Sequence, residues 1–162
     1  MMNTSWNDFF VAILGAAAAL TGLIFVGVSI SLSRILSIPK LSSRAAESII
    51  LLVNVVVISA LCLVPEQPLF YLAIEFLGIG TVIWIITFTL DLKMLLNADK
   101  AFKKHYRQNM LFTQLAILPY IVSGIVTLVQ GSNGIYWLIP GIIFSFIKSV
   151  IDAWVLLVEI NR

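Results

Sequence analysis

Apolar residues fill this chain in five long stretches that are separated by shorter polar breaks. The stretches run over about residues 9–32, 48–64, 69–90, 110–129 and 135–160. A helix needs roughly 17–25 mostly apolar residues to cross a bilayer, and each stretch is long enough. Two breaks are long and charged, whereas PEQP and GSNG are tight turns containing Pro or Gly. The pattern predicts an all-α integral membrane helical bundle with five transmembrane helices, forming a single domain over residues 1–162.

Composition supports this class and leaves little material for catalysis. Of the 162 residues, 60% are hydrophobic and 11% are charged, whereas soluble domains average about 45–50% apolar and about 25% charged. The first stretch lacks a basic leader and is too long for a cleaved signal peptide, so we expect a retained span. One cysteine, Cys62, and one histidine, His105, leave almost nothing for a disulfide or a metal site. We therefore expect no enzyme, no metal and no cofactor.

Lysines and arginines gather in the two long breaks and predict the orientation. They are Arg34, Lys40 and Arg44 in the first break, Lys93, Lys100, Lys103, Lys104 and Arg107 in the second, and Arg162 at the end. Cytoplasmic loops are enriched in Lys and Arg, and an odd number of spans puts both breaks on one side. Nine of the ten basic residues then face the cytoplasm. We predict cytoplasmic loops at 33–47 and 91–109, with the N-terminus outside and the C-terminus inside.

The last span carries charge inside an apolar run, in FSFIKSVIDAW at 144–154. At 100° per residue, its polar residues fall within an arc of about 100°. They are Gly141, Ser145, Lys148, Ser149, Asp152 and Glu159. With a rise of about 1.5 Å per residue, Lys148 lies about 20 Å from the outer end of the span, near the bilayer centre. A central charge costs about 2.5–3.5 kcal/mol, so this stripe is expected to face protein or water rather than lipid.

Lys148 and Asp152 are four residues apart and are expected to pair along the helix. Such a pair leaves hydrogen-bonding positions unfilled, which a neighbouring helix or water should complete. Three interpretations stay open. The pair holds two helices together, it lines a solvated cavity or pore, or Lys148 is a Schiff-base lysine for an aldehyde cofactor. No other feature of the sequence favours the third.

Two more polar residues lie inside apolar stretches. Glu75, about two turns into the third span, either reaches the outer surface, pairs across helices or borders a water-filled vestibule. Asn54 in the second span has a depth that resembles the depth of Asp152, measured from the cytoplasmic side. We expect Asn54 to hydrogen-bond to the last helix.

Small residues share one face of the first span, in GAAAALTG. Gly15, Ala19 and Gly22 have the spacing that lets helix backbones approach closely. We expect this face to pack against another helix, either inside the bundle or between subunits.

The second basic segment, 91–109, alternates apolar side chains with charged ones, among them Lys100, Lys103, Lys104 and Arg107. It is either an ordinary positive-inside loop or a short interfacial helix that lies against anionic lipid headgroups. No nucleic acid is needed to explain these charges.

Three segments resemble a known family: AAAALTGLIFVGVSIS, SSRAAESIILL and DAWVLLVEI. Together they are similar to a family of small bacterial multi-pass inner-membrane proteins, some of which are labelled modulators of a membrane AAA protease. The resemblance covers both ends of the chain and implies location in a bacterial inner membrane. It carries over no catalytic or binding residue.

Two functions follow from these features. In the first, the chain is an oligomeric membrane channel or permeation protein. The stripe of Ser145, Lys148, Ser149, Asp152 and Glu159 then lines a wet path built between homo-oligomer copies, and Lys148 attracts an anion or another small ion. In the second, the chain is a non-catalytic membrane scaffold or regulatory subunit whose buried Lys–Asp pair fixes helix packing. The sequence favours the first over the second.

Overall fold

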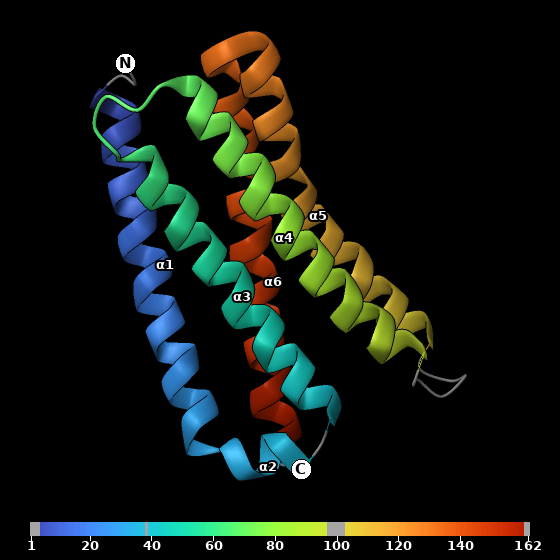
Figure 1. The fold of residues 1–162 in the computed structure, drawn as a ribbon. Helices are drawn as coiled ribbons and strands as arrows, with labels where there is room; N and C mark the ends of the chain where they lie inside the picture. The colour runs from blue at the N-terminus through green and yellow to red at the C-terminus, as the bar shows by residue number, and fades with distance from the viewer. Residues whose placement is uncertain (1–3, 38, 97–102, 161–162) are drawn as a thin grey trace.

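The computed structural model describes residues 4–37, 39–96 and 103–160, and these residues form helices joined by short connections (Figure 1). The helices are α1 (Thr4–Ile30), α2 (Leu32–Ser37), α3 (Pro39–Cys62), α4 (Leu69–Leu96), α5 (Lys103–Gln130), the 3-10 helix η1 (Gly131–Trp137) and α6 (Leu138–Ile160). The described residues contain no strand. The predicted all-helical class is confirmed.

Four segments are long and apolar enough to cross a membrane. They are Ser5–Ile30, Leu41–Cys62, Leu69–Leu96 and Lys103–Val158. The last contains α5, η1 and α6, and Figure 1 shows that the chain reverses at η1, so that α6 runs back beside α5. The structure therefore has four to five helices of membrane-spanning length, which is typical of a membrane protein.

The helices extend further than the apolar stretches. α3 begins at Pro39 rather than near residue 48. Pro suits a first helical position, because it lacks the backbone N–H that would have no helical partner there. α4 continues to Leu96 and α5 begins at Lys103, so most of the described part of the predicted loops 33–47 and 91–109 is helical. The charged residues that mark the ends of the apolar stretches therefore do not end the helices.

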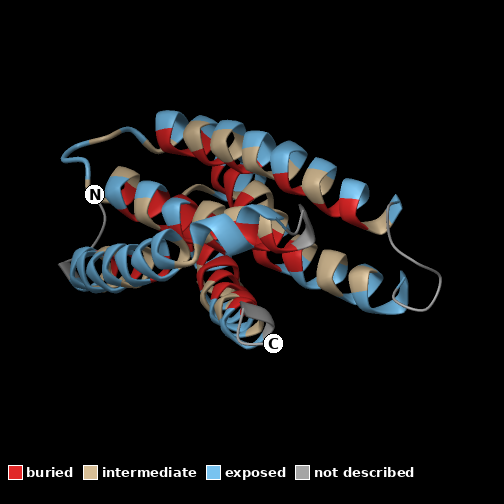
Figure 2. Cartoon of the chain, turned by 90° about the horizontal axis from the view of Figure 1, so that it is seen from below, coloured by how far each residue is buried: buried red, intermediate tan, exposed pale blue. Residues whose placement is uncertain are grey.

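α3 lies at the centre of the bundle and packs against α1, α4 and α6, while α5 packs against α4 and α6. Buried residues follow the inner faces and exposed residues the outer faces of these helices (Figure 2). Many exposed residues are large and apolar, such as Leu23, Phe25, Ile30 and Val82. Lipid would cover such side chains without an energetic penalty, which agrees with the membrane class.

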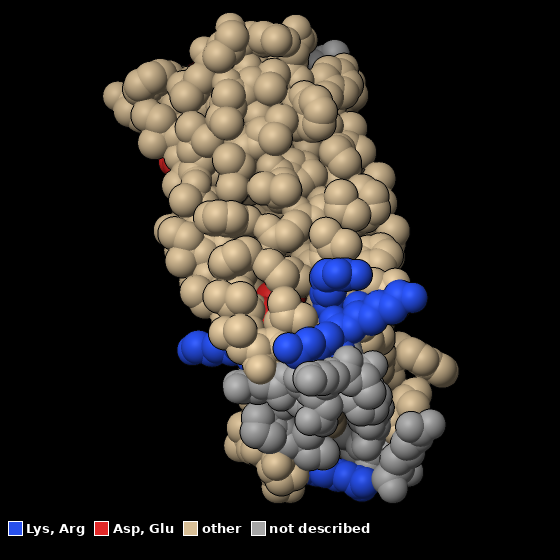
Figure 3. All heavy atoms as spheres, turned by 90° about the vertical axis from the view of Figure 1, so that its right-hand side faces the viewer, with Lys and Arg blue, Asp and Glu red and all other residues tan. Residues whose placement is uncertain are grey.

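The described part of the bundle has two different ends. The basic end carries Arg34, Lys93, Lys103, Lys104 and Arg107 on α2, α4 and α5. In Figure 3 the lysines and arginines gather toward one end of the visible face. The opposite end, the turn end, contains η1 and the α3–α4 connection. The main apolar cluster lies toward the turn end and includes Phe10, Phe76, Tyr120, Leu138 and Ile142.

The small-residue face of α1 does not pack within the chain. Gly15, Ala19 and Gly22 are exposed, and a Cβ added to either glycine would meet nothing within 4 Å. α1 instead places Phe10, Ala17 and Ile24 in the interior. Of the two expected partners for this face, a helix of the same bundle is therefore excluded for the described residues, and contact between subunits stays a prediction.

Candidate functional site

The polar stripe of α6 points into the bundle. Ser145, Lys148, Ser149 and Asp152 are all buried, with Lys148 3% and Asp152 1% exposed. Lys148 Nζ donates to Asp152 Oδ2 along the helix, as the spacing predicts. It also lies 3.5 Å from Glu47 Oε2 on α3, so the ammonium binds two carboxylates.

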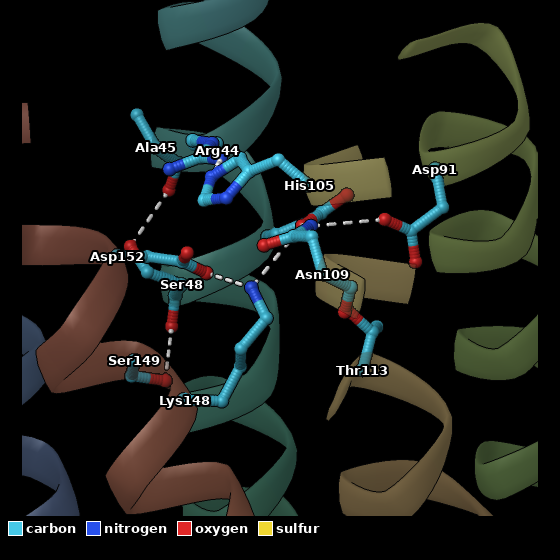
Figure 4. A network of polar contacts seen from close by, with 11 residues as sticks. Arg44, Ala45, Ser48, Asp91, His105, Asn109, Thr113, Lys148, Ser149 and Asp152 are labelled. Carbon is cyan, nitrogen blue, oxygen red and sulfur yellow. Dashed lines mark hydrogen bonds and ion pairs between the residues drawn. The ribbon is translucent and has the colours of Figure 1, made fainter. Parts of the chain in front are cut away.

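Asn109 of α5 extends this contact to α4. Its Nδ2 lies 3.4 Å from Glu47 Oε2 and 3.1 Å from Asp91 Oδ1. An amide nitrogen carries two hydrogens, so both donors of Asn109 have an acceptor. We call Asp152, Lys148, Glu47, Asn109 and Asp91 the ionic core. Its contacts join α6, α3, α5 and α4 in turn, and Figure 4 labels Asp152, Lys148, Asn109 and Asp91 among its members.

The helical period explains why these residues meet. On α3, Glu47 lies one turn before Leu51 and three turns before Ile58, and all three are fully buried. On α4, Thr87 and Asp91 are four residues apart on the buried face. On α5, Thr113 follows Asn109 by one turn, and its hydroxyl donates to the Asn109 carbonyl at 3.1 Å. Helical spacing therefore places Glu47, Asp91 and Asn109 on the inner faces of α3, α4 and α5.

Further hydrogen bonds surround the ionic core. Ser149 Oγ donates to the Ser48 carbonyl at 3.1 Å, which ties α6 to α3. The Ser145 and Tyr120 hydroxyls lie 3.1 Å apart between α6 and α5. Ser145, Lys148, Ser149 and Asp152 of the predicted stripe thus each have a polar partner.

Arg44 lies beside the ionic core on the basic side. Its Nη2 is 2.8 Å from His105 Nε2 at the start of α5. A guanidinium only donates, so His105 Nε2 accepts in this contact and that ring nitrogen carries no proton. His105 itself is exposed to solvent.

Asn54 does not make its expected contact. It is fully buried on α3, but neither side-chain amide atom has a hydrogen-bond partner among the described residues. Because Ser149 reaches Ser48, Asp152 lies nearer to the beginning of α3, and Asn54 is about 9 Å further along the helix than Ser48. The predicted match in depth between Asn54 and Asp152 is therefore wrong.

Glu75 lies apart from the ionic core, near the turn end. It accepts a 2.6 Å hydrogen bond from Gln67 Nε2 in the α3–α4 connection. An open pocket of about 600 Å³ beside this connection is lined by residues 61–69, Asn7 and Leu72. Glu75 therefore pairs locally near the surface.

The remaining predicted residues lie at the basic end or outside the description. Lys103, Lys104 and Arg107 are exposed in the first turns of α5. Lys100 and the side chain of Glu159 lie outside the described residues. No group of three or more His, Cys, Asp or Glu side chains in the described part of the chain is arranged to hold a metal ion.

Sequence reasoning missed Glu47, Asp91 and Asn109 as site residues, because it counted them as loop residues. A usable signal was present. Glu47 continues the spacing of Leu51, Asn54 and Ile58, and Asp91 continues that of Thr87. Extending the buried face beyond the last apolar residue would have found both carboxylates.

Comparisons with protein-family models, with curated proteins and with solved structures find no match to this chain. The resemblance noted in three sequence segments therefore stays an expectation, and any function rests on the geometry of the ionic core.

Proposed function

We propose that this chain is a non-catalytic membrane scaffold or regulatory subunit in which the ionic core fixes how four helices pack. The observation that supports it is the enclosure of the core. Lys148, Glu47, Asp91 and Asp152 are between 0% and 3% exposed, and their contacts join α3, α4, α5 and α6 within one chain.

Such a core defines helix register. Lys148 meets Glu47 only when α6 has one height relative to α3, whereas its contact with Asp152 lies within α6. A shift by one turn, about 5.4 Å, would separate Lys148 from Glu47 and leave that buried carboxyl group without its cation. Removing one member of a buried ion pair typically costs about 3–5 kcal/mol, so alternative packings are disfavoured.

The structure supports the scaffold over a pore between copies of the chain. The stripe of α6 contacts α3 and α5, and it is absent from the exposed face of α6, which presents Ile147, Val150 and Trp154. The apolar cluster toward the turn end, with Phe76 and Tyr120 fully buried, separates the ionic core from that end. A path across the membrane would have to pass between these side chains.

A permeation protein is the second candidate, and two residues favour it. Asn54 and Ser59 are fully buried on α3, on the turn-end side of the ionic core, and the Asn54 amide and Ser59 hydroxyl lack partners among the described residues. They continue the polar line toward the turn end. In this version water or a small ion fills a path inside each chain, and Lys148 sets its charge selectivity.

The proposed setting is a bacterial inner membrane crossed by five helices. The basic end then faces the cytoplasm and the N-terminus lies outside, because lysine and arginine are enriched in cytoplasmic segments. The exposed Lys103, Lys104 and Arg107 would meet anionic lipid headgroups there. The exposed face of Gly15, Ala19 and Gly22 is the proposed contact in a homo-oligomer.

A double-mutant cycle on Lys148 and Asp152 separates the two functions. Lys148→Met should lower the free energy of unfolding by about 3–5 kcal/mol, because Glu47 and Asp152 lose their cation. Adding Asp152→Leu should restore part of the loss, and exposed Lys103→Met should change stability by less than about 0.5 kcal/mol. The measurement is unfolding by SDS titration from detergent micelles.

The same variants are then tested for flux. The scaffold predicts that wild-type proteoliposomes conduct no more than empty liposomes, so the variants change stability alone. Ion or proton flux in the wild type that Lys148→Met abolishes would instead establish the permeation function. Equal stability of Lys148→Met and wild type would exclude the ionic core as a packing device.

A further inference from the structure

Glu47 and Asp91 are buried carboxyl groups on the neighbouring helices α3 and α4. Glu47 Oε2 and Asp91 Oδ1 share the amide of Asn109, at 3.4 and 3.1 Å. Their other oxygens, Glu47 Oε1 and Asp91 Oδ2, are buried and have no hydrogen-bond partner among the described residues. The two carboxyl groups are neighbours, because both lie within 3.4 Å of the same Asn109 nitrogen.

An ionised carboxylate only accepts hydrogen bonds, whereas a protonated one also donates. Two neighbouring carboxylates repel each other when both are ionised, and such pairs commonly hold one proton between them. Both Asn109 hydrogens are already used, one on Glu47 Oε2 and one on Asp91 Oδ1. One proton on the pair would supply the missing donor.

The sum of the buried charges around the pair also favours a bound proton. Three carboxyl groups, of Glu47, Asp91 and Asp152, share the interior with two cations, Lys148 from α6 and Arg44 from α3. With every group ionised, the formal charge is two minus three, or −1. His105 of α5 contacts Arg44 through Nε2 and is exposed rather than buried in this set. One bound proton makes this buried set neutral.

We propose that Glu47 and Asp91 form a proton-binding site in which one proton is held between the two carboxyl groups and joins α3 to α4. The site exchanges protons with the basic end, because Asn109 is half-buried within about two turns of the start of α5. Loss of the proton leaves two like charges between α3 and α4 and weakens their contact. The site makes the packing of the bundle depend on cytoplasmic pH.

The sign of the pH dependence follows from proton counting. The folded chain holds a proton at the pair that the exposed carboxyl groups of the unfolded chain release near neutral pH. Unfolding then releases a proton, so the folded state is weakened as pH rises. In the range where the folded pair keeps its proton, the folding equilibrium constant should fall about tenfold per pH unit.

The test combines SDS unfolding at several pH values with infrared spectroscopy of the purified protein. In wild type the folding equilibrium constant should fall with rising pH at the expected slope. Its infrared spectrum should show the carbonyl band of a protonated carboxyl group, and this band should shift in D₂O. Glu47→Gln and Asp91→Asn, which imitate the protonated group, should each remove the band and flatten the slope. Two variants provide a check in case one fails to fold.

Two controls identify the titrating group. Asp8→Asn, on exposed Asp8 of α1, should match wild type. His105→Gln should keep the slope of stability against pH, because the proposed proton is not on the imidazole.

A pH slope and an infrared band that persist in both Glu47→Gln and Asp91→Asn would overturn the proposal. So would stability that ignores pH and depends on sodium concentration, since a bound cation would then replace the proton. Neither result affects the double-mutant cycle on Lys148 and Asp152. The proton site and the scaffold function can therefore be disproved independently.

Discussion

Asn109 is the residue on which the ionic core depends for its connection to α4. Lys148 reaches Glu47, but Asp91 is joined to the core through the Asn109 amide. The amide offers two donors without adding charge, and Lys or Arg at this position would add a cation on a longer side chain. The uncharged donor therefore suits a place between two carboxyl groups that hold one proton.

We predict that Asn109→Ala destabilises the protein more strongly at high pH than at low pH. Two buried carboxyl oxygens lose their donors, at about 1–3 kcal/mol for each group left unsatisfied. The loss should be smaller at low pH, where a second proton can replace one missing donor. SDS unfolding at two pH values measures it.

The matched control is Asn133→Ala, because Asn133 is exposed in η1. It should leave stability within about 0.5 kcal/mol of wild type. A similar effect of both substitutions would show that Asn109 makes no contact of consequence.

At the residue scale, the sequence predicts the half of the core that lies inside an apolar run. Lys148 and Asp152 are visible because charges interrupt FSFIKSVIDAW. Glu47 and Asp91 were missed because a charge next to an apolar run looks like the beginning of a loop. Only their tertiary partners show that the helix continues through them.

At the scale of elements, the α5–η1–α6 hairpin positions the polar stripe of α6. Gly131 has φ of +66°, a left-handed conformation that glycine adopts without strain. Gly134 packs so closely that an added Cβ would lie 2.3 Å from the backbone nitrogen of Thr127. Ser123 Oγ donates to the Gly134 carbonyl at 2.8 Å and closes the turn. The GSNG turn predicted from sequence is thus a 3-10 turn packed onto α5.

We predict that Gly134→Ala destabilises the protein by about 1–3 kcal/mol, because the backbone of α5 has to move to admit a methyl group. Gly22→Ala is the matched control, since a Cβ there meets nothing within 4 Å. It should leave stability unchanged or raise it by up to about 1 kcal/mol through helix propensity. Thermal unfolding in detergent compares them, and equal midpoints for the two variants would contradict the close packing.

At the scale of the whole molecule, the sequence predicts the class and misses the arrangement. Long apolar runs indicate membrane helices because the bilayer requires them. The central position of α3 and the exposure of the Gly15–Gly22 face of α1 depend on which helices pack together. Helix periodicity alone does not specify this, since lipid-facing and protein-facing sides are both apolar.

The described part of the chain places α1's first residues and η1 at the turn end, opposite the basic end. This arrangement gives the predicted orientation a direct test by cysteine labelling. Native Cys62 is buried in α3 and is first replaced in Cys62→Ala. Ser132→Cys then adds a thiol in η1, and Lys104→Cys adds one at the basic end, where both residues are exposed.

We predict that a membrane-impermeant maleimide labels the Ser132→Cys protein in intact spheroplasts and labels the Lys104→Cys protein only after permeabilisation. The reason is the distribution of cations, since all five described residues that define the basic end lie on one side and lysine and arginine favour the cytoplasm. Asn7→Cys, exposed near the start of α1, should behave like Ser132→Cys. The reverse pattern would put the proton site of Glu47 and Asp91 in contact with the outer compartment, so the protein would then respond to external pH.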